Sequence, residues 1–278
     1  MIIGSSNRLS AEIARQSHLA QDVARLQVEI SGEKRILAPS DDPGGAARVT
    51  QIRTAQASEK AWAANADGAA ALASLTETNL TALGTAIDRA VELMTLARSA
   101  SASAADRKTY ATEIAGIVLD ITELSGQTDS RGQALFPETP LAIPVGKTST
   151  LQATLGRETV FGPAGSDMVS VLNAAVAALN SDATDVIAAT DDDLTAMQAA
   201  RNRLTDARGE HGARAAVIDQ VRARFVSSGL ALSEERSNIE DTDITAAAPR
   251  LQAKILTLEA AQASFARIHK QTLFDLLG

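Results

Sequence analysis

Hydrophobic residues recur at intervals of three and four near both ends of the chain, which predicts an amphipathic helix at each end. In residues 9–31 the apolar stripe contains Leu9, Ile13, Gln16, Leu19, Ala20, Val23, Leu26, Gln27 and Ile30. From about residue 244 onward it contains Ile244, Ala248, Leu251, Ile255, Leu258, Gln262 and Phe265. Both stripes are heptad-like seams with small and polar members, so we expect the N- and C-terminal helices to pair as a marginally stable coiled coil.

Three longer stretches between these ends also have helical periodicity. We expect long helices over residues 43–98, 105–129 and 191–237, and a short helix over residues 169–179. Alanine supplies much of the apolar content of these segments, and alanine lets helices pack closely without a wide core. The pattern therefore predicts a mainly α fold of long antiparallel helices that form a rod or bundle.

Two polar stretches interrupt the helices at similar distances from the two ends. The first, ILAPSDDPGG at residues 36–45, contains Pro39, and Asp41 or Asp42 can cap a helix that has Pro43 in its first position. The second, RSNIEDTD at residues 236–243, contains Ile239, Asp241 and Asp243. We expect both to be structural breaks. Pro249 follows the second break, so the last helix is expected to start or kink near it.

The middle of the chain differs in composition. Four of the seven prolines lie in residues 131–166. The segments 148–155 and 158–161 alternate weakly with period two on either side of Gly156-Arg157, which predicts a small β-hairpin.

The pattern divides the chain into three expected parts. Residues 1–40 with 244–278 would form a terminal coiled-coil domain, and residues 41–130 with 167–243 a helical rod. Residues 131–166 would form a small outer insertion that contains the hairpin.

Composition narrows the classes of function. The chain has 45% hydrophobic but only 3% aromatic residues, a net charge of −8 and no cysteine. The missing cysteines exclude disulfides and thiolate chemistry, and the acidic balance argues against nucleic-acid binding. The one arginine-rich run, residues 201–224, is interrupted by acidic residues and is typical of a salt-bridged helix face. The first residues lack the apolar run of a secretory signal, so any export is expected to proceed without a cleaved signal peptide.

Candidate catalytic and metal-binding residues are sparse. His18, His211 and His269 are isolated and lie in predicted helices, where each is interpreted as a polar helix position. The acidic groups at 41–42 and 191–193 stand where a helix needs an N-cap and negative charge. Gly44-Gly45 lacks a P-loop lysine. We therefore expect a protein that is not an enzyme, with no catalytic residue, cofactor or metal. Acidic residues on the amphipathic ends argue against membrane binding.

Three sequence stretches resemble one superfamily. ILAPSDDPGGAARV resembles the N-terminal break of bacterial flagellins and their junction relatives, and RSNIEDTDI resembles the matching C-terminal break. The tail LEAAQASFARIHKQTLFDLL resembles specifically the flagellar hook-associated protein 3 family, the hook–filament junction proteins. The resemblance covers both ends and the long helices. The middle region is shorter than in many junction proteins.

The resemblance implies a structural, flagellin-like subunit that is secreted and needed for motility. It would lie at the hook–filament junction, outside the cell. Its implied partners are further copies of itself, the first hook-associated junction protein, flagellin, and an export chaperone with the export apparatus. The implied assembly residues are Ile13, Val23, Leu26, Ile30, Leu251, Ile255, Leu258, Phe265, Ile268, Leu273, Phe274, Leu276 and Leu277.

Two other interpretations remain open at this stage. The chain could be a flagellin, the repeating subunit of the filament, which shares the core fold and the export route. It could also be a helical scaffold unrelated to flagella, but that interpretation leaves the paired breaks unexplained.

Overall fold

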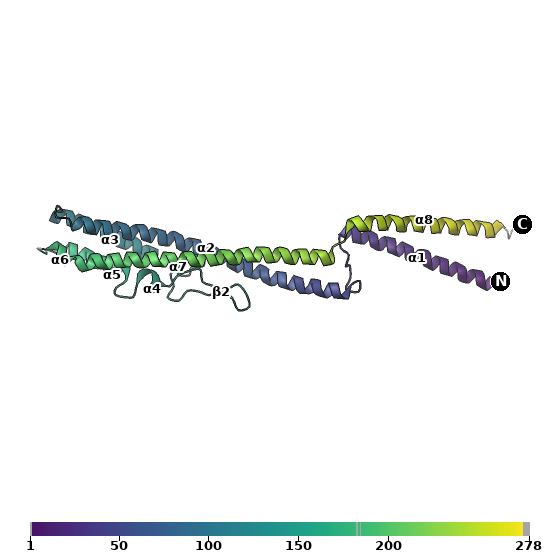
Figure 1. Ribbon diagram of the computed structural model, residues 1–278, viewed down its shortest axis with the longest axis horizontal. Helices are drawn as coiled ribbons and strands as arrows, with labels where there is room; N and C mark the ends of the chain where they lie inside the picture. The colour runs from purple at the N-terminus through teal and green to yellow at the C-terminus, as the bar shows by residue number, and fades with distance from the viewer. Residues whose placement is uncertain (1, 182, 184, 275–278) are drawn as a thin grey trace. The chain divides into compact units, whose positions relative to one another are not determined.

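The computed structural model of the chain describes residues 2–181, 183 and 185–274, and it describes side chains between residues 9 and 267 of those ranges. The elements are α1 (Ile2–Gly32), α2 (Pro43–Ala97), α3 (Ala104–Ser125), β1 (Ile143–Pro144), β2 (Thr150–Leu151), α4 (Arg157–Phe161), α5 (Met168–Leu179), α6 (Val186–Ala189), α7 (Asp191–Glu240) and α8 (Ile244–Phe274). Long helices and one two-stranded sheet confirm the expected fold class (Figure 1).

The backbone contacts separate the chain into two compact units. We call residues 58–228 the central unit, and residues 1–57 with 229–278 the terminal unit. The boundaries fall inside α2 and α7, because the two long helices contribute residues to both units.

The central unit contains a continuous apolar core. Its largest cluster joins α2, α3, α5 and α7 through fully buried side chains such as Leu83, Ile114, Leu172 and Leu204. A smaller cluster packs alanines of α2 against Ile218 and Phe225 of α7. Burial of each large side chain contributes about 1.5–3 kcal/mol. The core therefore accounts for the stability of this unit.

Local capping explains where the helices of the central unit begin. Ser103 and Asp106 form a reciprocal capping box at the start of α3, in which each side chain accepts a hydrogen bond from the other residue's backbone N–H. At the start of α5 the side chain of Asp167 accepts from Ser170 N at 2.9 Å.

The structure contains a small hairpin, but the prediction of which two segments pair in it is wrong. β1 pairs antiparallel with β2, Ile143 with Leu151 and Pro144 with Thr150, so both strands precede Gly156. Residues 158–161, expected as the second strand, lie in the helix α4. Packing overrides the weak alternation there, because the ring of Phe161 meets that of Phe136 edge-on at 5.4 Å and the guanidinium of Arg157 lies over it at 5.2 Å.

The segment between α3 and α5 packs against the helices of its own unit. Its residues Leu135, Leu155 and Phe161 belong to the main apolar cluster. Asn65 of α2 donates to Pro144 O at 2.8 Å, and Arg214 of α7 donates to Thr154 O at 2.7 Å. This segment is therefore an integral part of the central core.

In the terminal unit α1 and α8 lie side by side and antiparallel, with both chain ends at the same end of the pair (Figure 1). The helix α8 begins at Ile244 and continues through Pro249. A proline costs an interior helix a hydrogen bond and a clash, and these costs are smallest in the first turns. The helix thus starts at Ile244, directly after the capping residue Asp243, and not at the proline.

Candidate assembly interface

The α1–α8 pair is held by a heptad seam that is only partly buried. The half-buried side chains of α1 follow alternating steps of three and four, namely Leu9, Glu12, Gln16, Leu19, Val23, Leu26 and Ile30. On α8 they are Leu251, Lys254, Ile255, Leu258 and Phe265, with Ala247 and Ala261 fully buried. Alternation of this kind is the pattern of a coiled-coil seam. A two-helix pair covers only one side of each helix, so most of its surface stays open.

Two polar contacts cross this seam. Gln16 Nε2 donates to Ala261 O at 3.3 Å, and Lys254 Nζ pairs with an Asp22 carboxylate oxygen at 2.7 Å. The ion pair shifts the pKa of the Asp22 carboxyl below its ordinary value, chiefly through its hydrogen bond with Lys254. Both contacts are at least partly exposed and hold the pair in place only weakly.

Several large apolar side chains of the pair have no cover within the chain. Ile13 is 53% exposed, Val28 52%, Ile244 45% and Leu256 68%. Ala20 and Gln27 are exposed as well. The stripe seen in the sequence therefore splits in two. One part forms the seam with α8, and the part that includes Ile13 faces away from it.

The predicted assembly residues fall into four groups. Val23, Leu26, Ile30, Leu251, Ile255, Leu258 and Phe265 are half-buried in the seam, and Ile13 is exposed. Ile268, Leu273 and Phe274 lie on the helical backbone of α8, outside the residues with described side chains. Leu276 and Leu277 lie outside the described residues altogether.

The structure brings the two predicted breaks together. Lys34 and Asp241 form an antiparallel bridge between segments far apart in sequence. Arg35 N donates to Glu240 O at 2.8 Å, and Thr242 N donates to Glu33 O at 3.0 Å. Two successive backbone contacts of this type fix the chain segments as a short β-ladder does. The base of the α1–α8 pair is therefore fastened by the breaks themselves.

The aspartates of the breaks satisfy backbone donors at turns and helix ends. Asp41 accepts from Leu37 N and Ala38 N, and these bonds with the Arg25 guanidinium hold its pKa below the ordinary range. Asp42, the second of the two candidates, caps α2 by accepting from Gly45 N at 2.8 Å. Asp243 caps α8 through Thr245 and Ala246, which lowers its pKa in the same way. Unpaired helix-end N–H groups explain why these positions carry acids.

The remaining break residues define the course of the chain. Pro39 is exposed in the turn that Asp41 closes. Pro43 is the first residue of α2, a position whose N–H makes no hydrogen bond within the helix, so proline loses nothing there. Ile239 lies one residue before the end of α7, and its carbonyl accepts from Arg35 Nη2 at 2.7 Å.

Sequence reasoning missed the ionic centre of this region. The Glu240 side chain is 10% exposed and lies near three cations, Arg53 of α2 at 2.5 Å, Lys34 at 3.7 Å and Arg236 of α7 at 3.9 Å. Lys34 also pairs with Asp241, which lowers the pKa of that carboxyl. We call Lys34, Arg53, Arg236, Glu240 and Asp241 the Glu240 cluster. Arg236 and Glu240 form a local i,i+4 pair, but the sequence gives no signal that the distant Lys34 and Arg53 meet the same carboxylate.

The described residues offer little support for catalysis. His18 is exposed, but His211 is buried in the central unit, where its ring Nε2 lies 2.9 Å from Ala73 O and donates to it. His211 is a polar position on a helix, as the sequence suggested, and its burial lets it join α7 to α2. Within the described ranges we find no group of His, Cys, Asp and Glu side chains arranged to hold a metal ion. None of the described helices combines the length and apolarity needed to cross a bilayer.

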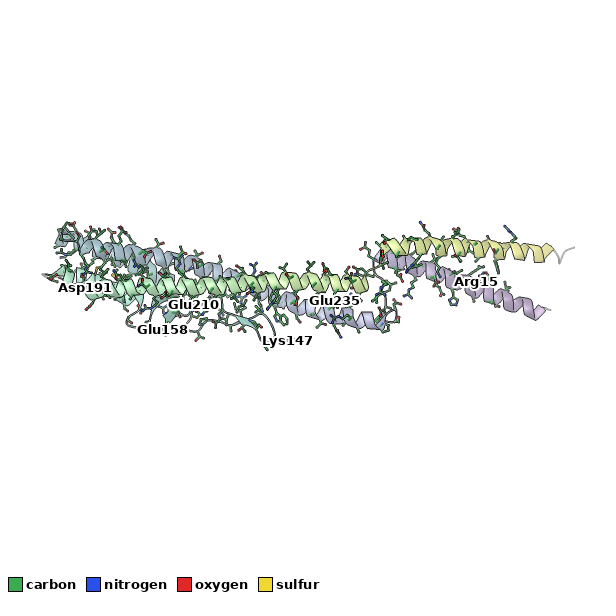
Figure 2. The ribbon with its side chains drawn as sticks, in the orientation of Figure 1. Arg15, Lys147, Glu158, Asp191, Glu210 and Glu235 are labelled. Atoms are coloured by element: carbon green, nitrogen blue, oxygen red, sulfur yellow. The ribbon has the colours of Figure 1, made fainter. Side chains whose placement is uncertain are left out.

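The arginine-rich stretch of α7 forms ion pairs, as its charge pattern predicted. Arg208 pairs with Glu77, Arg214 with Glu210, and Arg222 with Asp67 and Asp219. Figure 2 shows Glu210 on α7 among the charged side chains of this helix. Paired guanidinium groups are poorly placed to neutralise the phosphates of a nucleic acid.

Comparison with known proteins identifies relatives over about nine tenths of the chain. Residues 5–139 match the family described as the bacterial flagellin N-terminal helical region. Flagellar hook-associated protein 3 of Salmonella typhimurium is 25% identical, with 91% of this chain and 92% of the relative covered. The same protein of Escherichia coli is 24% identical over 89% of this chain and 90% of that protein.

Solved structures give the same fold. A flagellar hook-associated protein from Vibrio parahaemolyticus superposes with a TM-score of 0.66 at 16% identity, and covers 72% of this chain and 100% of its own. At this level of identity the likeness concerns the fold of the shared helices.

Proposed function

We propose that this chain, which belongs to the flagellar hook-associated protein 3 family within the bacterial flagellin superfamily, is a structural subunit of the bacterial flagellum. Its role is to join the hook-side junction protein to the flagellin filament. The match to the bacterial flagellin N-terminal helical region and the two hook-associated relatives support the resemblance stated from the sequence.

The observation that supports an assembly role is the surface of the α1–α8 pair. Its seam residues are only half-buried, and Ile13, Val28 and Leu256 are more than half exposed. Because about half of each side chain is already covered, a partner that covers the rest stabilises the assembly by about 1 kcal/mol per side chain. Further copies of the chain, the first hook-associated junction protein and flagellin would provide that cover.

The absence of enzymatic chemistry is part of the same proposal. The relatives carry the names of flagellar structural proteins. Among the described residues, Asp42 and Asp243 act as helix caps, Glu240 forms ion pairs, and His211 joins two helices. We propose that the function is mechanical: the subunit connects two assemblies of different proteins, the hook-side junction protein and the flagellin filament.

The location follows from this role. The subunit would lie outside the cell at the hook–filament junction, after passage through the flagellar export apparatus and with the help of an export chaperone. A terminal unit with a thin seam and no cysteine would unfold readily for that passage.

Immunogold electron microscopy on intact flagella tests the assignment. An antibody against the exposed turn 146–150, around Lys147 in Figure 2, would mark the subunit on the central unit. We expect label confined to one point just beyond the hook. Label along the whole filament would make the chain a flagellin. No antigen in denatured, purified flagella would leave only a scaffold unrelated to flagella.

A further inference from the structure

Glu240 stands out because it is the only buried carboxylate among the described residues, and it lies where both breaks meet. Its partners lie on three segments of the chain: Lys34 follows α1, Arg53 lies on α2, and Arg236 lies one turn earlier on α7. Removal of one partner from a buried ion pair leaves an uncompensated charge and is strongly destabilising. The carboxylate therefore constrains all three segments at once.

The seam above this cluster specifies its own alignment poorly. The seam contains polar and small residues, such as Gln16 and Ala261. These residues have no large apolar side chain that would fit opposite only one position of the other helix. The observed contacts place Gln16 opposite Ala261 and Asp22 opposite Lys254. A slide by one heptad would place Leu19 near Leu251 and Leu26 near Ile244, so apolar positions would still meet apolar positions.

We propose that Glu240 is a positioning residue that sets the register in which the two ends of the chain pair. The Glu240 cluster and the adjoining backbone bridge between Lys34 and Asp241 hold one fixed point, and the heptad seam propagates the alignment along α1 and α8. Buried polar groups that fix the register of a helix pair at a cost in stability are a known use of such pairs. The proposal concerns the chain alone and does not depend on the flagellar role.

The surrounding charges do not substitute for Glu240. On α1 Glu29 pairs with Arg25, and in the first break Asp41 also pairs with Arg25 while Asp42 lies near Arg35. On α2 Arg48 pairs with the half-exposed Glu235 of α7. Asp241 is itself 39% exposed and bound to Lys34. Each of these acids is more solvated or already occupied, so none can gather the same three cations.

The absence of cysteine from the whole sequence permits a direct test by site-specific cross-linking. A slide of one heptad moves facing residues by about 10 Å, so a cross-linker shorter than that distinguishes the registers. The pair Asp22→Cys with Lys254→Cys reports the observed register, because these side chains already meet at 2.7 Å. The pairs Arg15→Cys with Lys254→Cys and Glu29→Cys with Lys254→Cys report slides of seven residues in either direction.

The full-length chain would carry each cysteine pair with and without Glu240→Gln, which removes the charge and keeps the shape. With Glu240 present, we expect the observed-register cross-link almost alone. With Glu240→Gln we expect the ratio of observed to shifted products to fall about tenfold, since loss of the charge-assisted hydrogen bond from Arg53 Nη2 costs at least the ~1.4 kcal/mol that this ratio needs. The matched control is Glu235→Gln, five residues earlier on α7 and in an exposed ion pair, which should leave the ratio unchanged.

Three results would overturn the proposal. The first is an unchanged product ratio with Glu240→Gln. The second is loss of the observed cross-link with no shifted product, which would mean that Glu240 only stabilises the pair. The third is absence of the observed cross-link when Glu240 is present. If Glu240→Gln does not fold, each cysteine pair is compared with and without Arg53→Gln, which removes one of the three cations and leaves Glu240 in place.

Discussion

The central and terminal units are built from the same two long helices but differ in what they bury. Both apolar clusters lie in the central unit, where α2, α3, α5, α7 and the loop segment enclose side chains on several sides. Among the described residues of the terminal unit, the fully buried apolar side chains are Val49, Ile52, Ala247 and Ala261. Similar helix propensity therefore leads to unequal stability, because tertiary burial and not propensity sets how firmly a helix is held.

The difference also concerns polar contacts. The terminal unit is held by backbone bridges and ion pairs at the breaks, whereas charges in the central unit lie around an apolar core. A unit fastened by partly exposed ion pairs responds to salt and acid, and a unit fastened by apolar burial responds little to either. The stabilities of the two units should thus respond differently to changes in salt concentration and pH.

Deletion of residues 251–278 should have the largest effect. The change removes most of α8 and leaves α1 without the partner that covers its seam. We expect the central unit to keep its helices and its cooperative unfolding, while incorporation into flagella is abolished. Circular dichroism and a motility assay in a strain lacking the native gene measure the two effects. Normal incorporation of the shortened chain would contradict the assigned role of the seam.

Phe265→Asp should block incorporation with a smaller structural change. The side chain is half-buried on α8, so a carboxylate there places charge in the seam without reaching the central core. We expect unchanged helicity in the central unit and absence of the variant from isolated flagella. Gln262→Asp, on an exposed neighbouring position, serves as the control. Loss of all helicity with Phe265→Asp would instead place Phe265 in the core of the monomer.

A matched pair of leucines measures the difference between the units directly. Leu83 is fully buried in the central core, so Leu83→Ala should lower the free energy of unfolding by about 2–5 kcal/mol. Leu258 is half-buried in the seam, and Leu258→Ala should cost about 1 kcal/mol in the free chain, roughly half of a full burial. Urea unfolding followed by circular dichroism gives both values. Equal costs would show that the seam is packed as a core.

Mild acidification should have the smallest effect of these changes, and it should lower the stability of the terminal unit first. Five of its carboxyl groups have a lowered pKa, chiefly from hydrogen bonds to cations or backbone N–H groups; they are Glu12, Asp22, Asp41, Asp241 and Asp243. A lowered folded-state pKa gives stability that is present above the unfolded pKa and lost as the pH falls through the folded value.

The central unit has a different balance. There the pKa of Asp106 is lowered by its capping box, but burial and the neighbouring Asp192 raise the pKa of Asp193, which favours the protonated form in the folded state. We expect the protection of amides in α1 and α8, measured relative to the intrinsic exchange rate at each pH, to fall below about pH 4, near the ordinary aspartate pKa, before the protection of α3 and α5 does. Simultaneous loss of protection in both units would contradict the comparison.

The sequence predicted the long helices well because their periodicity extends over many turns. The capping role of Asp42 and the position of Pro43 also followed from local chemistry alone. The hairpin partner and α4 did not, because residues 158–161 are helical through contacts between Phe161, Phe136 and Arg157 that join distant positions. Short segments take their conformation from such contacts more than from their own pattern.

The candidate site was predictable in composition but not in geometry. The stripe of α1 contains two overlapping heptads, and only the position of α8 shows that Leu19 and Leu26 belong to the seam while Ile13 does not. The Glu240 cluster could not be found from the sequence at all. Arg53 and Glu240 are separated by most of the chain, and neither lies in a pattern that points to the other.

The small size of the hairpin has a consequence for how copies of this chain can associate. An open strand edge presents unpaired N–H and C=O groups that recruit strands from other molecules. Here each strand has two residues, and Pro144 in β1 lacks the N–H that such recruitment needs. Among the described residues this sheet therefore offers almost no template for amyloid-like growth. Copies at high local concentration would therefore associate through helix faces. A mispaired helix can dissociate and then pair again in another position.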